Sequence, residues 1–152
     1  IKYKDRCGDA ALTVEIGEIS KEKKDLIYHT QKVLEETTKL VRADLPIITL
    51  TRFMENYMAQ YDYKAVKEYG GHGIGKEMHE EPYIPNSYNG KDYGLLKENQ
   101  VICLEPIFTI GNGKIRIKKD GWSVETKDKM PAAQFENMVL VKKNGYEVLT
   151  HH

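Results

Sequence analysis

The sequence GHGIG at residues 71–75, followed by HEEP at 79–82, divides a helix-forming half of the chain from a strand-forming half. His72 stands between two glycines, so its imidazole can reach a ligand without crowding from neighbouring side chains. Residues 70–96 are rich in glycine and proline and predict a long, loop-rich stretch. Compact domains seldom keep such a loop without a function. This stretch is therefore the first place to look for a functional site.

Upstream of this stretch, the sequence predicts a hairpin and a long helix. Residues 1–17 predict two short strands, with a turn at 5–8 and the second strand over 10–16. Ser20 is a suitable N-cap for a helix running to about Arg42. Its apolar pairs recur every seven residues and so share one face: Leu26/Ile27, Val33/Leu34 and Leu40/Val41. A coiled coil is the alternative, but three such pairs favour a helix packed on a sheet.

On the opposite face of that helix, Glu35 and Lys39 are spaced for an ion pair. After the break at Leu45-Pro46, a second helix is predicted over about residues 51–61. Its methionine and aromatic side chains are expected to face the core rather than a cofactor: Phe53, Met54, Tyr57, Met58 and Tyr61.

Downstream, short strands are predicted over residues 101–110, 115–118, 122–126 and 135–141. The last of these turns at Asn144-Gly145, a strong hairpin dipeptide, into a strand over 146–149. The order of a strand pair, two helices and then strands predicts an α+β domain. Its helices should pack on one face of a mostly antiparallel sheet.

Composition excludes several classes of protein. The chain has 152 residues, enough for one domain, and 23 basic and 23 acidic side chains give it no net charge. No basic excess points to nucleic acid, and no apolar run is long enough to cross a bilayer. Cys7 and Cys103 are too few for a disulfide framework; they could pair, but buried free thiols in a reducing compartment are favoured. We expect a cytoplasmic protein.

Three segments carry candidate metal ligands. His72 lies in the first, while Glu105 and Glu136 each interrupt an otherwise apolar strand. A lone buried carboxylate would take up a proton, but two of them, with His72 and Asp9, could share a divalent cation. Such an oxygen-rich site with one imidazole suits Mn, Co, Fe or Zn. The alternative is that each glutamate points outward as the polar half of a strand's alternation.

These motifs, in their order along residues 8–150, resemble type I methionine aminopeptidases. GHGIG with a downstream HE-P also resembles prolidase and aminopeptidase P relatives. The segment DGW at 120–122, followed by TKD at 126–128 and AQFE at 133–136, narrows the resemblance to the methionine enzymes. The resemblance implies a pita-bread fold. Two pseudo-symmetric halves, with helices outside and strands inside, would surround a dinuclear centre of Co, Mn, Fe or Zn.

The resemblance also implies roles for individual residues. Asp9 and Glu136 would bridge two divalent ions, and His72 and Glu105 would be further ligands of the first ion. Glu105 would also accept and return a proton, and His72 and His79 would belong to the catalytic group. His79 would donate to the scissile amide and then to the oxyanion.

Around the methionine side chain, the resemblance implies an aromatic wall at Trp122 and a contact near His79 at Met78. Gln134 would lie near the ions. Two positions depart from the family pattern: Met78 stands where many relatives have an aromatic residue, and Asn137 stands where histidine is familiar.

The implied activity is removal of the initiator methionine from nascent polypeptides at the ribosome. We expect a monomer that needs neither nucleic acid nor membrane. Residues 1–150 would be the C-terminal catalytic portion of one pita-bread domain that lacks much of its N-terminal half, including a further aspartate ligand. Residues 151–152 resemble a purification-tag remnant. The alternatives are an X-Pro peptidase of the same fold and a non-catalytic relative that binds partners.

Overall fold

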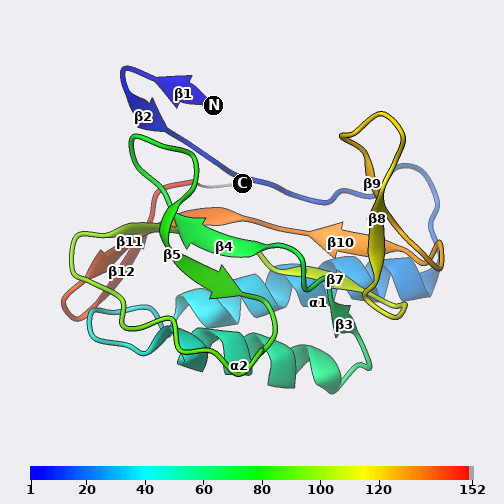
Figure 1. Cartoon of the computed structure of the whole chain (residues 1–152). Coiled ribbons are helices and arrows are strands. Elements are labelled where there is room, and N and C mark those ends of the chain that lie inside the picture. Colours follow the sequence, from blue (N-terminus) through cyan, green and yellow to red (C-terminus); the bar gives the residue numbers. More distant parts are fainter. Residues whose placement is uncertain (151–152) are drawn as a thin grey trace.

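In the computed structural model, which describes residues 1–150, two helices cover one face of antiparallel sheets (Figure 1). The helices are α1 (Lys21–Thr38) and α2 (Ile47–Ala59), which pack against each other. The largest sheet has the strand order β12 (Gly145–Val148), β11 (Asn137–Lys142), β6 (Val101–Leu104), β4 (Gly70–Gly73) and β5 (Glu80–Pro85). Every strand pairing among the described residues is antiparallel. The predicted α+β arrangement is therefore confirmed.

A second sheet and two hairpins complete the fold. The sheet has the order β10 (Ala132–Gln134), β7 (Ile107–Thr109) and β3 (Lys64–Ala65). The hairpins are β1 (Lys2–Tyr3) with β2 (Arg6–Cys7), and β8 (Ile115–Ile117) with β9 (Val124–Thr126). Both hairpins project from the side of the sheets opposite the helices (Figure 1). None of the helices within residues 1–150 has the length and apolarity needed to traverse a bilayer.

The N-terminal hairpin turns earlier than predicted. Its turn is Lys4-Asp5, where both residues have positive φ, as a two-residue hairpin loop requires. The predicted strand over residues 10–16 is wrong; within it, only Ala11 forms a bridge, to Glu136. This segment instead runs along the uncovered side of the sheets before α1 begins (Figure 1).

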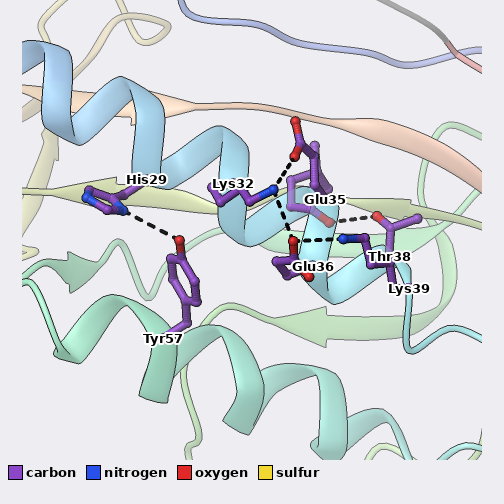
Figure 2. Close-up of polar contacts among 8 residues, drawn as sticks. His29, Lys32, Glu35, Glu36, Thr38, Lys39 and Tyr57 are labelled. Atoms are coloured by element: carbon purple, nitrogen blue, oxygen red, sulfur yellow. Dashed lines mark hydrogen bonds and ion pairs between the residues drawn. The ribbon is translucent and has the colours of Figure 1, made fainter.

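Helix α1 buries Leu26, Val33 and Leu34, as the seven-residue recurrence predicts. It ends at Thr38 rather than near Arg42, because the next amides bond three residues back, in a tightened final turn. On the outer face, Glu36 lies between Lys32 and Lys39 and pairs with both, at 3.1 and 2.8 Å (Figure 2). The predicted partner of Lys39, Glu35, pairs with Lys32 instead.

Helix α2 begins at Ile47, four residues before the predicted start, directly after Pro46. Proline is tolerated there because the first turn of a helix leaves its amides without helical partners. Ile47, Leu50, Met54 and Met58 fill the core, whereas Phe53 and Tyr57 lie at its edge. Tyr61 lies beyond the helix and is 42% exposed, so its predicted inward position is wrong.

In the second half of the chain, the strands begin and end at other residues than predicted. The predicted strand over 101–110 divides at Glu105-Pro106 into β6 and β7, which belong to different sheets, because proline lacks the amide a ladder needs. The stretch predicted as loop contains β4 and β5. Strand β10 was not predicted, and the final hairpin turns at residues 143–144, with Gly145 already in β12. Trp122 precedes β9 rather than lying in it.

Cys7 and Cys103 are free and buried, as predicted. The expectation of a tag remnant at residues 151–152 lies outside the described residues.

Candidate metal centre

The position of His72 is fixed by close packing of three strands. It lies in β4, between β5 and β6, and pairs with Tyr83 and Cys103. A Cβ added to Gly71 would lie 2.2 Å from the Cys103 carbonyl oxygen, and one added to Gly73 would lie 2.2 Å from that of Glu81. The close approach of the neighbouring backbones therefore requires both flanking glycines, which is a reason that the sequence pattern did not indicate.

The His72 ring is buried and has a defined orientation. Its Nδ1 lies 2.9 Å from the Gly73 carbonyl oxygen. Because a carbonyl only accepts hydrogen bonds, Nδ1 carries the hydrogen and the lone pair is on Nε2. Metal-binding histidines are commonly oriented in this way. Nε2 is then the atom available to a ligand.

Strand register gathers the candidate ligands on one face of the sheet. Cys103 of β6 pairs with His72 on one side and with Met138 of β11 on the other. Directly paired residues share a face, and so do residues two apart along a strand. Glu105 follows Cys103 by two positions, and Glu136 precedes Met138 by two. All these side chains therefore project from the face opposite the helices.

The distances within this group suit a shared cation. Ligand atoms of His72, Cys103 and Glu136 all lie within 4.8 Å of one another. Glu105 Oε2 lies 3.9 Å from His72 Nε2. Among the described residues, Asp9 lies just outside this tight group; its amide donates to the Met138 sulfur at 3.3 Å. The structure thus brings His72, Glu105 and Glu136 together, with Asp9 beside them.

The carboxylates of this group are crowded and poorly solvated. Burial, followed by the charges of Glu136 and Asp9, raises the pKa of Glu105 to about 8. Burial also raises the pKa of Glu136 to about 7; the charge of Asp9 adds to this, and a hydrogen bond from Cys103 opposes it. Burial lowers the pKa of His72. A cation placed between these groups would stabilise the ionised form of both carboxylates and could bind the neutral imidazole.

The donor set therefore fits a divalent cation. Carboxylates and an imidazole suit Mn, Co, Fe and Zn alike, and Cys103 adds a soft sulfur donor. Cys103 was missed as a candidate by sequence reasoning. It stands two positions before Glu105, so the alternation of the strand could have placed it on the same face.

Hydrogen bonds from two neighbouring side chains hold Glu105 in place. Gln134 Nε2 donates to Glu105 Oε1 at 3.1 Å, so Gln134 lies beside a candidate ligand. The buried Asn86 donates from Nδ2 to the Glu105 carbonyl oxygen at 2.8 Å. No signal in the sequence pointed to Asn86, because its role depends on a loop meeting the end of β6.

Two cavities meet at Glu105. One, of about 500 Å³, is lined by His72, His79 and Tyr83 among others. The His79 ring stands edge-on to His72, with 4.4 Å between the ring centroids. The other cavity, of about 630 Å³, extends past Gln134 to Trp122, whose side chain is 88% exposed at the tip of the β8–β9 hairpin.

Met78 is placed differently from Trp122 and His79. Its side chain packs against the small apolar cluster of Cys7, Ile74 and Cys103. The described lining of the two cavities does not include it. Its substrate-binding role stays a prediction, as do those of Trp122 and His79.

Comparison with known proteins finds similar sequences over nearly the whole chain. The sequence model of metallopeptidase family M24 matches residues 1–143. A methionine aminopeptidase of Buchnera aphidicola is 36% identical over 94% of this chain and 54% of its own length, and one of Mycoplasma capricolum is 39% identical over 93% and 57%. The chain thus spans about half the length of the curated relatives it matches.

Solved structures show the same fold. The methionine aminopeptidase of Thermotoga maritima superimposes with a TM-score of 0.93 at 31% identity, covering 99% of this chain and 60% of that one. The prolidase of Pyrococcus horikoshii, at 22% identity, covers 98% of this chain and 37% of its own with a TM-score of 0.77, and shares the fold alone. These likenesses confirm the predicted pita-bread fold, and with the family match they show that the chain belongs to metallopeptidase family M24.

Proposed function

We propose that this chain carries the catalytic centre of a metal-dependent methionyl aminopeptidase, which removes the initiator methionine from nascent proteins and peptides. The observation that carries the proposal is the meeting of His72, Glu105 and Glu136 on the uncovered face of the sheet, beside two cavities. The likeness to methionine aminopeptidases over nearly the whole chain supports it. In this proposal residues 1–150 form the C-terminal catalytic portion of one pita-bread domain.

The ligands proposed for two divalent ions, of Co, Mn, Fe or Zn, are Asp9, His72, Glu105 and Glu136. Bound in such a site, divalent cations acidify water and polarise a peptide carbonyl. The hydrogen bond from Gln134 occupies Glu105 Oε1 and leaves Oε2 on the side of His72.

Glu105 is suited to proton transfer because it borders both cavities. Its carboxylate accepts a proton from the attacking water and returns it to the leaving amine. His79 lines the smaller cavity beside His72, where its ring can donate to the scissile amide and to the developing oxyanion. Both residues act on the same peptide bond from neighbouring walls.

The larger cavity is proposed to receive the methionine side chain. Its apolar lining includes Val66, Ile107 and Ala133, and the exposed Trp122 stands at its rim. Polar side chains such as Glu105 and Gln134 also line it, and its apolar part suits an unbranched thioether side chain. Met78 is proposed to contact the substrate from its position against the apolar cluster of Cys7, Ile74 and Cys103.

The proposed setting is the cytoplasm, with the protein acting as a monomer on nascent chains at the ribosome and without nucleic acid or membrane.

An X-Pro peptidase of the same fold is the competing activity. The X-Pro aminopeptidase of Thermotoga maritima superimposes with a TM-score of only 0.72, against 0.93 for the methionine enzyme of the same organism. This difference favours the methionyl activity.

The test measures release of methionine from Met-Ala-Ser, with Mn²⁺ or Co²⁺, by the complete polypeptide that carries these residues. His72→Ala should abolish release, whereas His29→Ala, a matched histidine change on α1, should leave it near wild type. Unchanged turnover in His72→Ala would contradict the proposal. A preference of the wild type for Xaa-Pro substrates over Met-Ala would replace it with the competing activity.

A further inference from the structure

Relying on the proposed function only for the presence of a cation, we propose that Cys103 is a direct ligand of the ion held by His72. Its sulfur would give the centre a preference for thiophilic divalent cations. The four oxygen and nitrogen donors of the proposed site do not require this sulfur, so the inference adds a ligand of a different kind.

The placement of Cys103 is fixed by the strands on both sides of it. It is fully buried in β6, directly opposite His72 in β4, and its side chain shares the face of that imidazole. Its sulfur lies within 4.8 Å of the ligand atoms of His72 and Glu136. Donors of one ion, with bonds of about 2.0–2.3 Å, are at most about 4.6 Å apart. Three donors around one ion lie closer together than this two-donor limit, so binding of one ion would draw the three side chains inward.

The other buried thiol is oriented differently, although it belongs to the same apolar cluster. Cys7 donates its S–H to the Lys76 carbonyl oxygen, at 3.4 Å, in the loop between β4 and β5. Among the described residues, Cys7 is not part of the group formed by His72, Cys103 and Glu136. The two cysteines therefore provide a test and its matched control in one protein.

Ligation has a defined chemical balance. The S–H bond of Cys103 breaks, a bond from its sulfur to the cation forms, and the proton leaves to solvent through the adjoining cavity. A thiolate binds Zn²⁺, Co²⁺ and Cd²⁺ much better than Mn²⁺. The competing role for Cys103 is to donate a hydrogen bond to Glu136 without touching the ion. Serine keeps that donor but removes the soft ligand, so Cys103→Ser separates the two roles.

The first experiment is a Co²⁺ titration followed by absorption spectroscopy of wild type, Cys7→Ser and Cys103→Ser. Ligation predicts a sulfur-to-cobalt charge-transfer band in the near ultraviolet for wild type and Cys7→Ser, and its loss in Cys103→Ser. Visible cobalt bands without that band in wild type would overturn the inference and leave the peptidase centre intact. Absence of any cobalt binding would instead count against both the ligand and the proposed centre.

Calorimetry supplies a second measurement. Cys103→Ser should weaken Cd²⁺ binding by more than about 100-fold, because loss of a hydrogen-bonding partner outside the coordination sphere already costs about 10- to 100-fold. Mn²⁺ binding should change much less. Equal changes for both ions would overturn the inference. If Cys103→Ser fails to fold, a band retained by Cys7→Ser supports the inference and its loss overturns it, because Cys103 is then the single thiol within residues 1–152.

Discussion

Neighbouring residues of β6 and β11 point to two faces of the sheet that are built differently. Ile102 and Leu104 of β6, with Val139 of β11, lie in the apolar core beneath α1 and α2. Cys103 and Glu105 point to the other face, where acids and an imidazole are buried beside a much smaller apolar cluster. Apolar burial stabilises the first face, whereas burial of charge costs free energy on the second.

This contrast indicates how the fold supports a reactive centre. The helix-covered face provides the stability that allows the opposite face to hold carboxylates whose pKa values are raised toward neutrality. Substitutions on the two faces should therefore separate, one set changing stability and the other changing metal binding and activity.

The largest expected effect is that of Glu105→Ala on activity. The change removes a proposed ligand and the proposed proton acceptor together, so methionine release from Met-Ala-Ser should fall by about 10³-fold or more. Thermal unfolding of the variant without added metal should show no loss of stability. A variant that is active but unstable would reverse the assignment of the two faces.

On the helix-covered face, Leu50→Ala should lower stability and leave metal binding nearly unchanged. Leu50 is fully buried in α2, and truncation of such a side chain costs about 2–5 kcal/mol of unfolding free energy. Denaturant titration measures that loss, and calorimetry with Mn²⁺ should give an affinity close to wild type. A large change in Mn²⁺ affinity with little loss of stability would contradict the separation of the faces.

The pH dependence of stability sharpens the contrast further. Without metal, Glu105 has a folded-state pKa of about 8 against an ordinary value of 4.5. Well below pH 4.5 the Glu105 carboxyl is protonated in both the folded and the unfolded protein. Its raised pKa then has no effect on the free energy of unfolding. Between pH 4.5 and about 8 the unfolded state releases a proton that the folded state retains. The free energy of unfolding therefore falls by up to about 1.4 kcal/mol for each pH unit in this interval.

Glu105→Gln isolates this contribution, because glutamine resembles the protonated acid at every pH. Wild type and variant should be similar in stability near pH 5, and the variant should become the more stable of the two as the pH approaches 8. Saturating Mn²⁺ should restore the wild type. Urea titrations at the two pH values measure the difference, and a wild type that gains stability over the variant with rising pH would contradict the raised pKa.

The smallest effect is expected on the outer surface of α1. Glu36 pairs with Lys32 and Lys39 at the partly exposed surface of α1, where ion pairs contribute little (Figure 2). Glu36→Gln should leave the denaturation midpoint and the Mn²⁺ affinity nearly unchanged. A marked drop in either would mean that this exposed network stabilises the helix-covered face.

Sequence patterns identified side chains that the structure brings together more successfully than they identified the strand boundaries. Glu105 and Glu136 stood out because each interrupts an apolar strand, and both now lie near His72. The strand predicted over residues 101–110 is too long, because at Pro106 the chain passes from one sheet to the other. A local sequence pattern does not show such a change of sheet.

What the sequence did not predict depends on contacts between distant segments. Asn86 bonds the Glu105 backbone across a loop, and Cys103 meets His72 only through strand pairing. The close approach that makes Gly71 and Gly73 necessary is likewise a property of three adjacent strands. Such contacts require the register, which residue periodicity alone does not define.

The central claim is that His72, Glu105 and Glu136 share one cation, and anomalous diffraction from crystals grown with Mn²⁺ tests it most directly. We predict an anomalous peak at about 2.0–2.3 Å from His72 Nε2 and from an oxygen of each glutamate. A fully occupied Mn²⁺ peak elsewhere, with these three side chains bound to no ion, would contradict it.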